Sequence, residues 1–130
     1  MMIKDRDLEW ALRSKENNNY KSEGERRIAS FLDKNEINYE YERGVLVKFP
    51  YDKQRIWYPD FYLPEFGSYI EYYGLAGRQM YDRGIKTKED VYTRMSLDVI
   101  PVFPWTFNDN WQGYIMSELK DRCDSASIQQ

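Results

Sequence analysis

The stretch IWYPDFYLPEFGSYIEYY, residues 56–73, decides the fold of this 130-residue chain. It holds two runs rich in aromatic and aliphatic residues, 56–63 and 68–73, which favour extended strands. The PEFG tetrapeptide between them begins with proline and ends with glycine, a composition typical of a tight turn. The stretch therefore predicts a β-hairpin, in which Asp60 and Glu71 lie close together as cross-strand neighbours.

Further elements extend the hairpin on both sides. Residues 38–47, in which tyrosine alternates with glutamate, predict a strand that completes an antiparallel meander with the other two. Apolar periodicity predicts the remaining elements: a helix from Ser22 to about Asn35, a helix over 82–95, a strand over 99–103 and a helix over 109–122. Pro101 within the last strand indicates an edge position or an irregularity in that strand. This order predicts an α/β domain in which helices flank a mixed sheet of about four strands.

Composition indicates one folded domain. Hydrophobic residues make up 42% of the chain and aromatic residues 17%, which favours a globular core over disorder. We expect the domain to span 22–123, after an N-terminal arm over 1–21 and before a flexible tail over 124–130. Within that arm, residues 5–14 predict a short charged helix that ends before three consecutive asparagines.

The residue types excluded by composition narrow the possible chemistry. The chain has no histidine and a single cysteine, Cys123, so Ser-His-Asp catalysis, His-ligated metal sites and an internal disulfide are all excluded. No apolar run is long enough to span a membrane, and the charged start differs from a signal peptide, so we expect a cytoplasmic protein. The net charge of −3 does not favour nucleic acid, and any basic patch has to be local.

Asp60 and Glu71 are the first candidate site residues. Two carboxylates at cross-strand distance repel each other unless a proton or cation lies between them. A hard divalent cation, magnesium or manganese, is the natural guest for oxygen ligands. The alternative is that both are solvated strand charges. The neighbours of Glu71, which are Ile70, Tyr72 and Tyr73, favour a site instead.

Lys88 is the second. On a helix it lies in one stripe with Ile85, Tyr92 and Met95, whereas Lys86 points away. An ammonium on an apolar face needs an anionic partner, which the carboxylate pair offers. The alternative is a lysine whose charged end reaches past the core to water.

Glu25 is the third. It shares a helix face with Ile28 and Leu32, whereas Glu23 lies on the opposite side. The spacing Ser22-x-x-Glu25 also fits a capping box, in which the glutamate bonds back to the amide of the first residue. The sequence thus leaves two roles open for Glu25, a helix cap and an outer metal ligand.

These residues together resemble the PD-(D/E)XK nuclease superfamily, which has a restriction-endonuclease-like core. The resemblance rests on Glu25 in a first helix, the Pro59-Asp60 pair and Glu71 in an apolar strand. The expected order of elements over about residues 20–105 also resembles that core, which runs helix, three strands, helix and strand (αβββαβ).

The likeness is more particular in two segments, and the chain departs from the superfamily in one position. Residues 35–42 and 58–64 are similar to the junction-resolving endonucleases of T-odd phages. The superfamily usually carries lysine two residues after the acidic strand residue, where this chain has Tyr73. Lys88 resembles the lysine that some branches carry on the following helix.

The resemblance implies a divalent-metal-dependent endonuclease that hydrolyses DNA phosphodiester bonds and leaves 5′-phosphate ends. Asp60, Glu71 and the backbone carbonyl of Tyr72 would hold Mg²⁺ or Mn²⁺, with Glu25 reaching it directly or through water. Lys88 would orient the attacking water or stabilise the transition state. A junction resolvase, a restriction or homing enzyme and a repair nickase all fit this description.

Basic residues near the two helices are candidates for DNA contact, with solvated surface charges as the alternative. They would neutralise phosphates without reading sequence: Lys21, Arg26 and Arg27 at the first helix, and Arg78, Arg83 and Lys86 around the second. Cutting both strands needs two sites, so we expect a homodimer that uses the N-terminal arm or the segment 105–111.

Two non-enzymatic interpretations compete with the nuclease. Tyr73 in the place of lysine favours a catalytically degenerate nuclease fold that binds nucleic acid or a protein. A tyrosine-rich interaction domain is the other, and it predicts no metal at Asp60 and Glu71.

Overall fold

A four-stranded sheet of order β1-β4-β5-β6 forms the centre of the protein. The computed structural model describes residues 20–129, so the helix expected over 5–14 lies outside the described residues. The elements in chain order are α2 (Glu23–Lys34), β1 (Glu40–Tyr41), β2 (Val45–Lys48), β3 (Gln54–Trp57), β4 (Phe61–Leu63), β5 (Ser68–Tyr72), α3 (Gln79–Arg94), β6 (Val99–Val102), the 3₁₀ helix η1 (Pro104–Asn108) and α4 (Trp111–Gln129).

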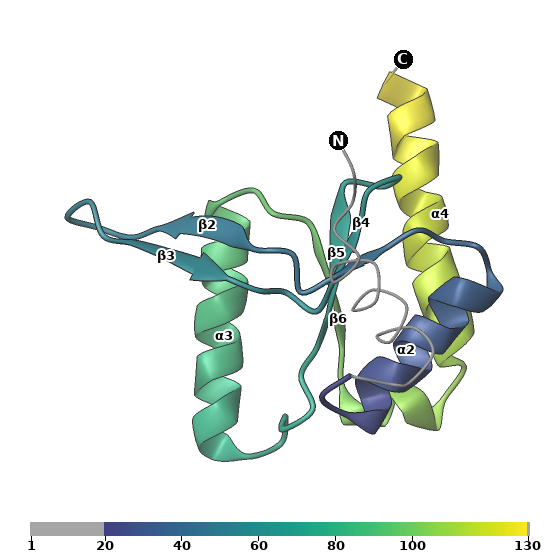
Figure 1. Ribbon diagram of the computed structural model, residues 1–130, viewed down its shortest axis with the longest axis horizontal. Coiled ribbons are helices and arrows are strands. Elements are labelled where there is room, and N and C mark those ends of the chain that lie inside the picture. The colour runs from purple at the N-terminus through teal and green to yellow at the C-terminus, as the bar shows by residue number, and fades with distance from the viewer. Residues whose placement is uncertain (1–19, 130) are drawn as a thin grey trace, which may run out of the picture.

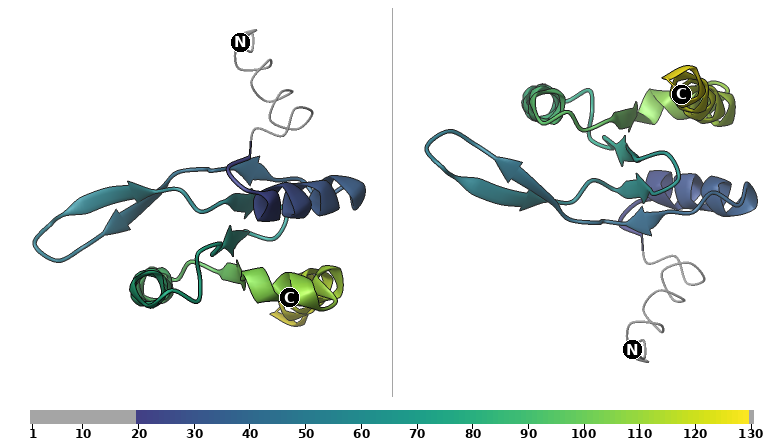
Figure 2. Two further views of the ribbon diagram at one scale, coloured as in Figure 1. Left: turned by 90° about the horizontal axis from the view of Figure 1, so that it is seen from below. Right: turned by 90° about the horizontal axis from the view of Figure 1, so that it is seen from above.

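The sheet is mixed and has helices on both faces. β1, β4 and β5 are antiparallel, and β6 runs parallel to β5. Helices α2 and α4 cover one face, while α3 lies on the other (Figures 1 and 2). The predicted α/β class and the mixed four-stranded sheet are confirmed. Pro101 lies in β6 at the edge of the sheet, as predicted, where its missing N–H leaves no ladder bond unmade.

Two of the three predicted meander strands are each divided in the structure. The expected strand over 38–47 becomes β1 and β2, and the one over 56–63 becomes β3 and β4. The breaks fall at Glu42, which has a positive φ of 55°, and at the segment 58–60, where Pro59 lacks an amide donor. The outer halves, β2 and β3, pair with each other as a separate two-stranded sheet that projects from the main one (Figure 1).

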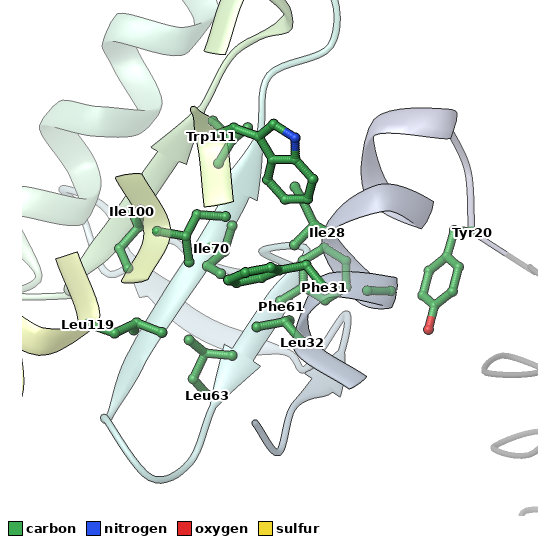
Figure 3. Close-up of a cluster of buried hydrophobic side chains, with 13 residues drawn as sticks. Tyr20, Ile28, Phe31, Leu32, Phe61, Leu63, Ile70, Ile100, Trp111 and Leu119 are labelled. Carbon is green, nitrogen blue, oxygen red and sulfur yellow. The ribbon is translucent and has the colours of Figure 1, made fainter. Parts of the chain in front are cut away.

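The hydrophobic core lies between the sheet and the α2–α4 layer. Ile28 and Leu32 of α2 are fully buried against the strands, as the helical spacing predicts. Trp111, Ile115 and Leu119 point inward from α4 and are buried in the same cluster. Figure 3 shows this cluster, whose labelled members are Tyr20 and residues of α2, β4, β5, β6 and α4.

The two later helices are longer than their sequence patterns indicate. α3 begins at Gln79, three residues before Asp82, and α4 continues to Gln129, past Arg122. In α3, a helix of 16 residues, only Val91 and Tyr92 are buried. Among the described residues, no helix has both the length and the apolar character needed to cross a membrane.

Candidate active site

Asp60 and Glu71 lie opposite each other where the hairpin opens. Phe61 pairs with Ile70, so the next step of the same register sets Asp60 against Glu71. Asp60 stands just before β4, and its Oδ2 accepts a hydrogen bond of 2.7 Å from the amide of Tyr72. A side chain thus takes the acceptor position that a strand carbonyl would occupy. Both carboxylates are buried, with 5% and 3% of their surfaces exposed.

Burial and neighbouring charge act together on Asp60. Burial raises the pKa of its carboxyl, and the charges of Glu25 and Glu71 raise it further, to about 7. The Tyr72 amide and the ammonium of Lys21 act in the opposite direction and favour the ionised form. Asp60 therefore exchanges its proton near neutral pH, and a cation placed beside it would compete with that proton.

Glu71 is held by two groups from α3. The hydroxyl of Tyr92 donates to Glu71 Oε2 at 2.5 Å, and Lys88 Nζ lies 3.6 Å from Glu71 Oε1. Burial first, and then the charge of Glu71, raise the pKa of the Tyr92 hydroxyl above its usual range, so it stays protonated as a donor. Ile85, Lys88 and Met95 are half-buried in one stripe with Tyr92. The lysine is 44% exposed, so its ammonium lies at the mouth of the site.

Tyr73 occupies the position where the superfamily pattern has lysine. Its ring is buried and stacks on Phe103, with the ring centroids 5.5 Å apart. Within the described part of the chain its hydroxyl is buried without a hydrogen-bond partner. Lys88 Nζ lies 5.9 Å from the centre of the Tyr73 ring. The aromatic ring thus fills the space beside Glu71, and the ammonium reaches that carboxylate from the helix.

Glu25 is both a helix-cap residue and a neighbour of the carboxylate pair. Its amide donates to Ser22 Oγ at 3.1 Å, and Ser22 Oγ donates to Glu25 Oε2 at the same distance. The predicted cap is therefore present, but the carboxylate bonds to the serine hydroxyl where the pattern predicts the backbone amide. Its other oxygen, Oε1, accepts a hydrogen bond from the hydroxyl of Tyr41.

Lys21 lies closer to the carboxylates than the sequence indicates. Its Nζ is 3.3 Å from Glu42 Oε1. Burial alone would lower the pKa of Lys21, but Glu42 and then the more distant Glu25 and Asp60 raise it. A second ammonium therefore belongs to the site, in addition to Lys88.

The other predicted DNA-binding residues divide between the two sides of the sheet. On α2, Arg26 forms an ion pair with Glu23, and the guanidinium carbon of Arg27 lies 4.3 Å from the centre of the Phe107 ring. Three are exposed around the first half of α3: Arg78, Arg83 and Lys86. The structure thus brings Lys21 and Lys88 to the carboxylates, and among the described residues none of the other five forms an ion pair or hydrogen bond with Asp60 or Glu71.

The donor set fits a magnesium or manganese ion held by two carboxylates. In residues 20–129 no three acidic or cysteine side chains converge as a metal-binding group. Asp60 and Glu71 nevertheless supply adjacent, buried, hard oxygen donors, and Mg²⁺ commonly keeps several waters when it binds one or two carboxylates. Because Ser22 and Tyr41 already hold both oxygens of Glu25, this geometry favours an outer role for that residue. The Tyr72 carbonyl stays a predicted ligand.

Sequence analysis missed the two tyrosines whose hydroxyls donate hydrogen bonds to Glu25 and Glu71. Tyr41 lies among alternating tyrosines and glutamates, and Tyr92 lies in the stripe of Lys88, but each pattern shows only which way the residue faces. A hydroxyl partner depends on long-range packing, since 16 residues separate Tyr41 from Glu25 and 21 separate Tyr92 from Glu71.

Comparison with known proteins finds no matching family model, no matching curated protein and no matching solved structure. The family resemblance therefore rests on the residues quoted for it in the sequence.

Proposed function

We propose that this protein is a divalent-metal-dependent endonuclease that hydrolyses DNA phosphodiester bonds at Asp60 and Glu71. The observation that carries the proposal is the buried cross-strand carboxylate pair, with the ammonium of Lys88 3.6 Å from Glu71. The chain has no histidine, and metal-assisted hydrolysis needs only oxygen ligands such as these two carboxylates.

The order of elements in the main sheet supports a restriction-endonuclease-like core. If β2 and β3 are treated as an insertion, the chain order is α2, β1, β4, β5, α3, β6, which gives αβββαβ. In that arrangement Glu25 lies in the first helix, Asp60 directly before the second strand and Glu71 in the third strand. These are the positions that the superfamily resemblance assigns to its acidic residues.

Each side chain has a defined task in the proposed reaction. Asp60, after losing its proton, and Glu71 would hold Mg²⁺ or Mn²⁺ together with the Tyr72 carbonyl. When bound, the metal would polarise the phosphate and lower the pKa of a water. Lys88 is half-exposed, so its ammonium can turn from Glu71 to the phosphate and neutralise charge that develops there.

The surrounding hydroxyls keep these groups in place. Tyr92 fixes one oxygen of Glu71, which leaves the other free to exchange Lys88 for a cation. Ser22 and Tyr41 hold Glu25 near the pair, where it orients water. Such fixed partners limit the reorganisation needed during the reaction.

Substrate contact and assembly are further parts of the proposal. The exposed cations around the first half of α3 would bind phosphates: Arg78, Arg83 and Lys86. A homodimer would supply two sites for a junction or duplex. Trp105, which is 53% exposed and stacks on Phe103 at 4.9 Å, offers an interface in the predicted segment 105–111.

A binding protein with a degenerate nuclease fold is the alternative. Two observations favour it. Tyr73 fills the usual lysine position, and tyrosine hydroxyls already donate hydrogen bonds to the carboxylates of Glu25 and Glu71. This alternative predicts DNA binding without cleavage in any divalent metal.

Cleavage of supercoiled plasmid and of a four-way junction, in Mg²⁺ or Mn²⁺, separates the two. We expect the wild type to cut, Asp60→Asn to fall to background and Lys88→Ala to lose about 10²–10³-fold in rate. Lys120→Ala, an exposed lysine on α4, is the matched control and should cut normally. Wild type that binds DNA without cutting favours the degenerate fold, and cutting that persists in Asp60→Asn contradicts this site.

A further inference from the structure

The β2–β3 hairpin, here called the arm (Val45–Trp57), projects from the candidate active site. Its last residue, Trp57, precedes Asp60 by three positions. The arm crosses α3, and its tip extends beyond that helix (Figures 1 and 2). An isolated two-stranded sheet is only marginally stable in water, so the attachment of the arm needs an explanation.

The base of the arm is anchored to α3 near the end of the helix. Trp57 packs edge-on against Tyr92 with the ring centroids 5.7 Å apart, and Val47 is fully buried. Arg94 donates from Nη2 to the Lys48 carbonyl at 3.3 Å. Because Tyr92 also donates to Glu71, two side chains connect the arm to the carboxylate site.

The tip of the arm has an unusual residue for its conformation. Tyr51 and Asp52 both have positive φ, 63° and 59°, in the loop 49–53 that joins Lys48 of β2 to Gln54 of β3. A bulky residue seldom adopts this conformation. The Tyr51 side chain is 95% exposed, so packing does not account for its presence. Strain at an exposed aromatic residue points to a functional role.

One side of the arm forms an open groove of aromatic and basic residues. The groove has a volume of about 570 Å³ and is lined by Phe49, Pro50, Tyr51, Lys53, Arg55 and Trp57. The Phe49 and Trp57 rings lie 5.8 Å apart. Among residues 20–129, no acidic side chain forms an ion pair with Lys53 or Arg55. In a chain of net charge −3, the arm carries three basic residues and one acidic residue.

We propose that this groove binds single-stranded nucleotides and guides them toward Asp60 and Glu71. Aromatic faces and unpaired cations together are the features by which proteins hold single strands: bases stack on the rings and phosphates meet the cations. A four-residue strand spans about 13 Å, and stacked nucleotides repeat about every 3.4 Å, so the groove suits about three or four nucleotides.

The groove also narrows the substrate class of the proposed nuclease. A strand seated on the arm is unpaired within a few nucleotides of the cut, as in a branched, flapped or single-stranded substrate. This substrate assignment rests on the proposed function, whereas nucleotide binding by the groove does not. Binding is therefore tested without divalent metal, where no cleavage takes place.

The test is fluorescence anisotropy of a labelled oligothymidylate of about 12 nucleotides with full-length protein in EDTA. The double variant Tyr51→Asn and Arg55→Ala should bind at least about tenfold more weakly than wild type. Lys48→Ala is the matched control, because its side chain lies on the opposite face of the arm and it removes the same charge. We expect that control to change affinity by less than about twofold.

Three results would overturn the inference. The first is an equal loss of affinity in the groove variant and in Lys48→Ala. The second is wild-type protein that binds blunt duplex as tightly as single strand. The third is polyglutamate that displaces the oligonucleotide as readily as unlabelled DNA does. Thermal unfolding of each variant verifies folding. Tyr51→Asn should not lower the melting temperature, because asparagine adopts positive φ more readily than tyrosine. The plasmid-cleavage assay tests the nuclease proposal independently of this binding assay.

Discussion

The two faces of the β1-β4-β5-β6 sheet are covered in different ways. On one face α2 and α4 enclose a cluster of fully or nearly fully buried apolar side chains, including Ile28, Phe61 and Ile115. On the other face only two residues of α3 itself are buried, Val91 and Tyr92. The Tyr92 hydroxyl and the Lys88 ammonium of this helix point at Glu71. The contrast indicates that the first face stabilises the fold, and that the second holds the charged groups of the proposed site.

The largest expected effect on stability comes from emptying the first face. Phe61 is fully buried and packs against the rings of Tyr20, Tyr39 and Tyr41. Phe61→Ala should lower the free energy of unfolding by about 3–5 kcal/mol, measured by urea denaturation. Ile56→Ala, on the exposed arm, is the control and should change it by less than about 0.5 kcal/mol. A loss below about 1 kcal/mol at Phe61 would remove the contrast between the faces.

The next largest effect is a pH-dependent gain in stability when Asp60 is replaced. The folded pKa of Asp60, about 7, lies above its ordinary value of 3.8, chiefly because of burial. Between these values the native protein keeps a proton that the unfolded chain releases, so stability falls as pH rises from about 4 to about 7. Asp60→Asn should therefore be more stable than wild type at pH 8, by on the order of 2–4 kcal/mol.

Urea denaturation in EDTA at pH 4.5 and pH 8 measures this difference. The advantage of Asp60→Asn should shrink at the lower pH, where wild-type Asp60 is protonated in the native protein. An advantage that is the same at both pH values would show that Asp60 does not titrate as its burial indicates.

The smallest expected effect is the difference in stability lost when one tyrosine hydroxyl is removed from each face of the sheet. Tyr92→Phe removes the donor to buried Glu71 and should lower the free energy of unfolding by about 1–3 kcal/mol. Tyr114→Phe removes a hydrogen bond of 2.8 Å to the neutral Pro101 carbonyl, and about 0.5–1.5 kcal/mol is expected. A greater loss at Tyr114 would mean that charge on the α3 face adds nothing to the value of its hydrogen bonds.

Local patterns were sufficient to predict the elements of the first face. The spacing of Ile28 and Leu32 defines one side of a helix whatever lies against it, and α2 matches the predicted helix closely. The hairpin from Phe61 to Ile70 followed equally from a turn between two apolar runs. Burial on these elements repeats with the period of the backbone, which a sequence displays directly.

The arm could not be predicted in the same way. Residues 38–47 and 56–63 each contain several strand-forming residues on both sides of the break, so their composition does not show where pairing changes partner. β1 pairs with β4 and leaves β2 and β3 to each other, a choice made by long-range contacts. The partners of Glu25 and Glu71 were missed for the same reason, since Tyr41 and Tyr92 reach them only in the folded chain.

The most direct test of the account is calorimetric titration of the full-length protein with Mn²⁺ at pH 8. The central claim is that the buried Asp60–Glu71 pair is a cation site, which predicts Mn²⁺ binding by the wild type and at least about tenfold weaker binding by Asp60→Asn. Glu25→Gln should weaken binding less, because Ser22 and Tyr41 hold that carboxylate. Failure of the wild type to bind Mn²⁺, or equal binding by Asp60→Asn, would contradict the claim.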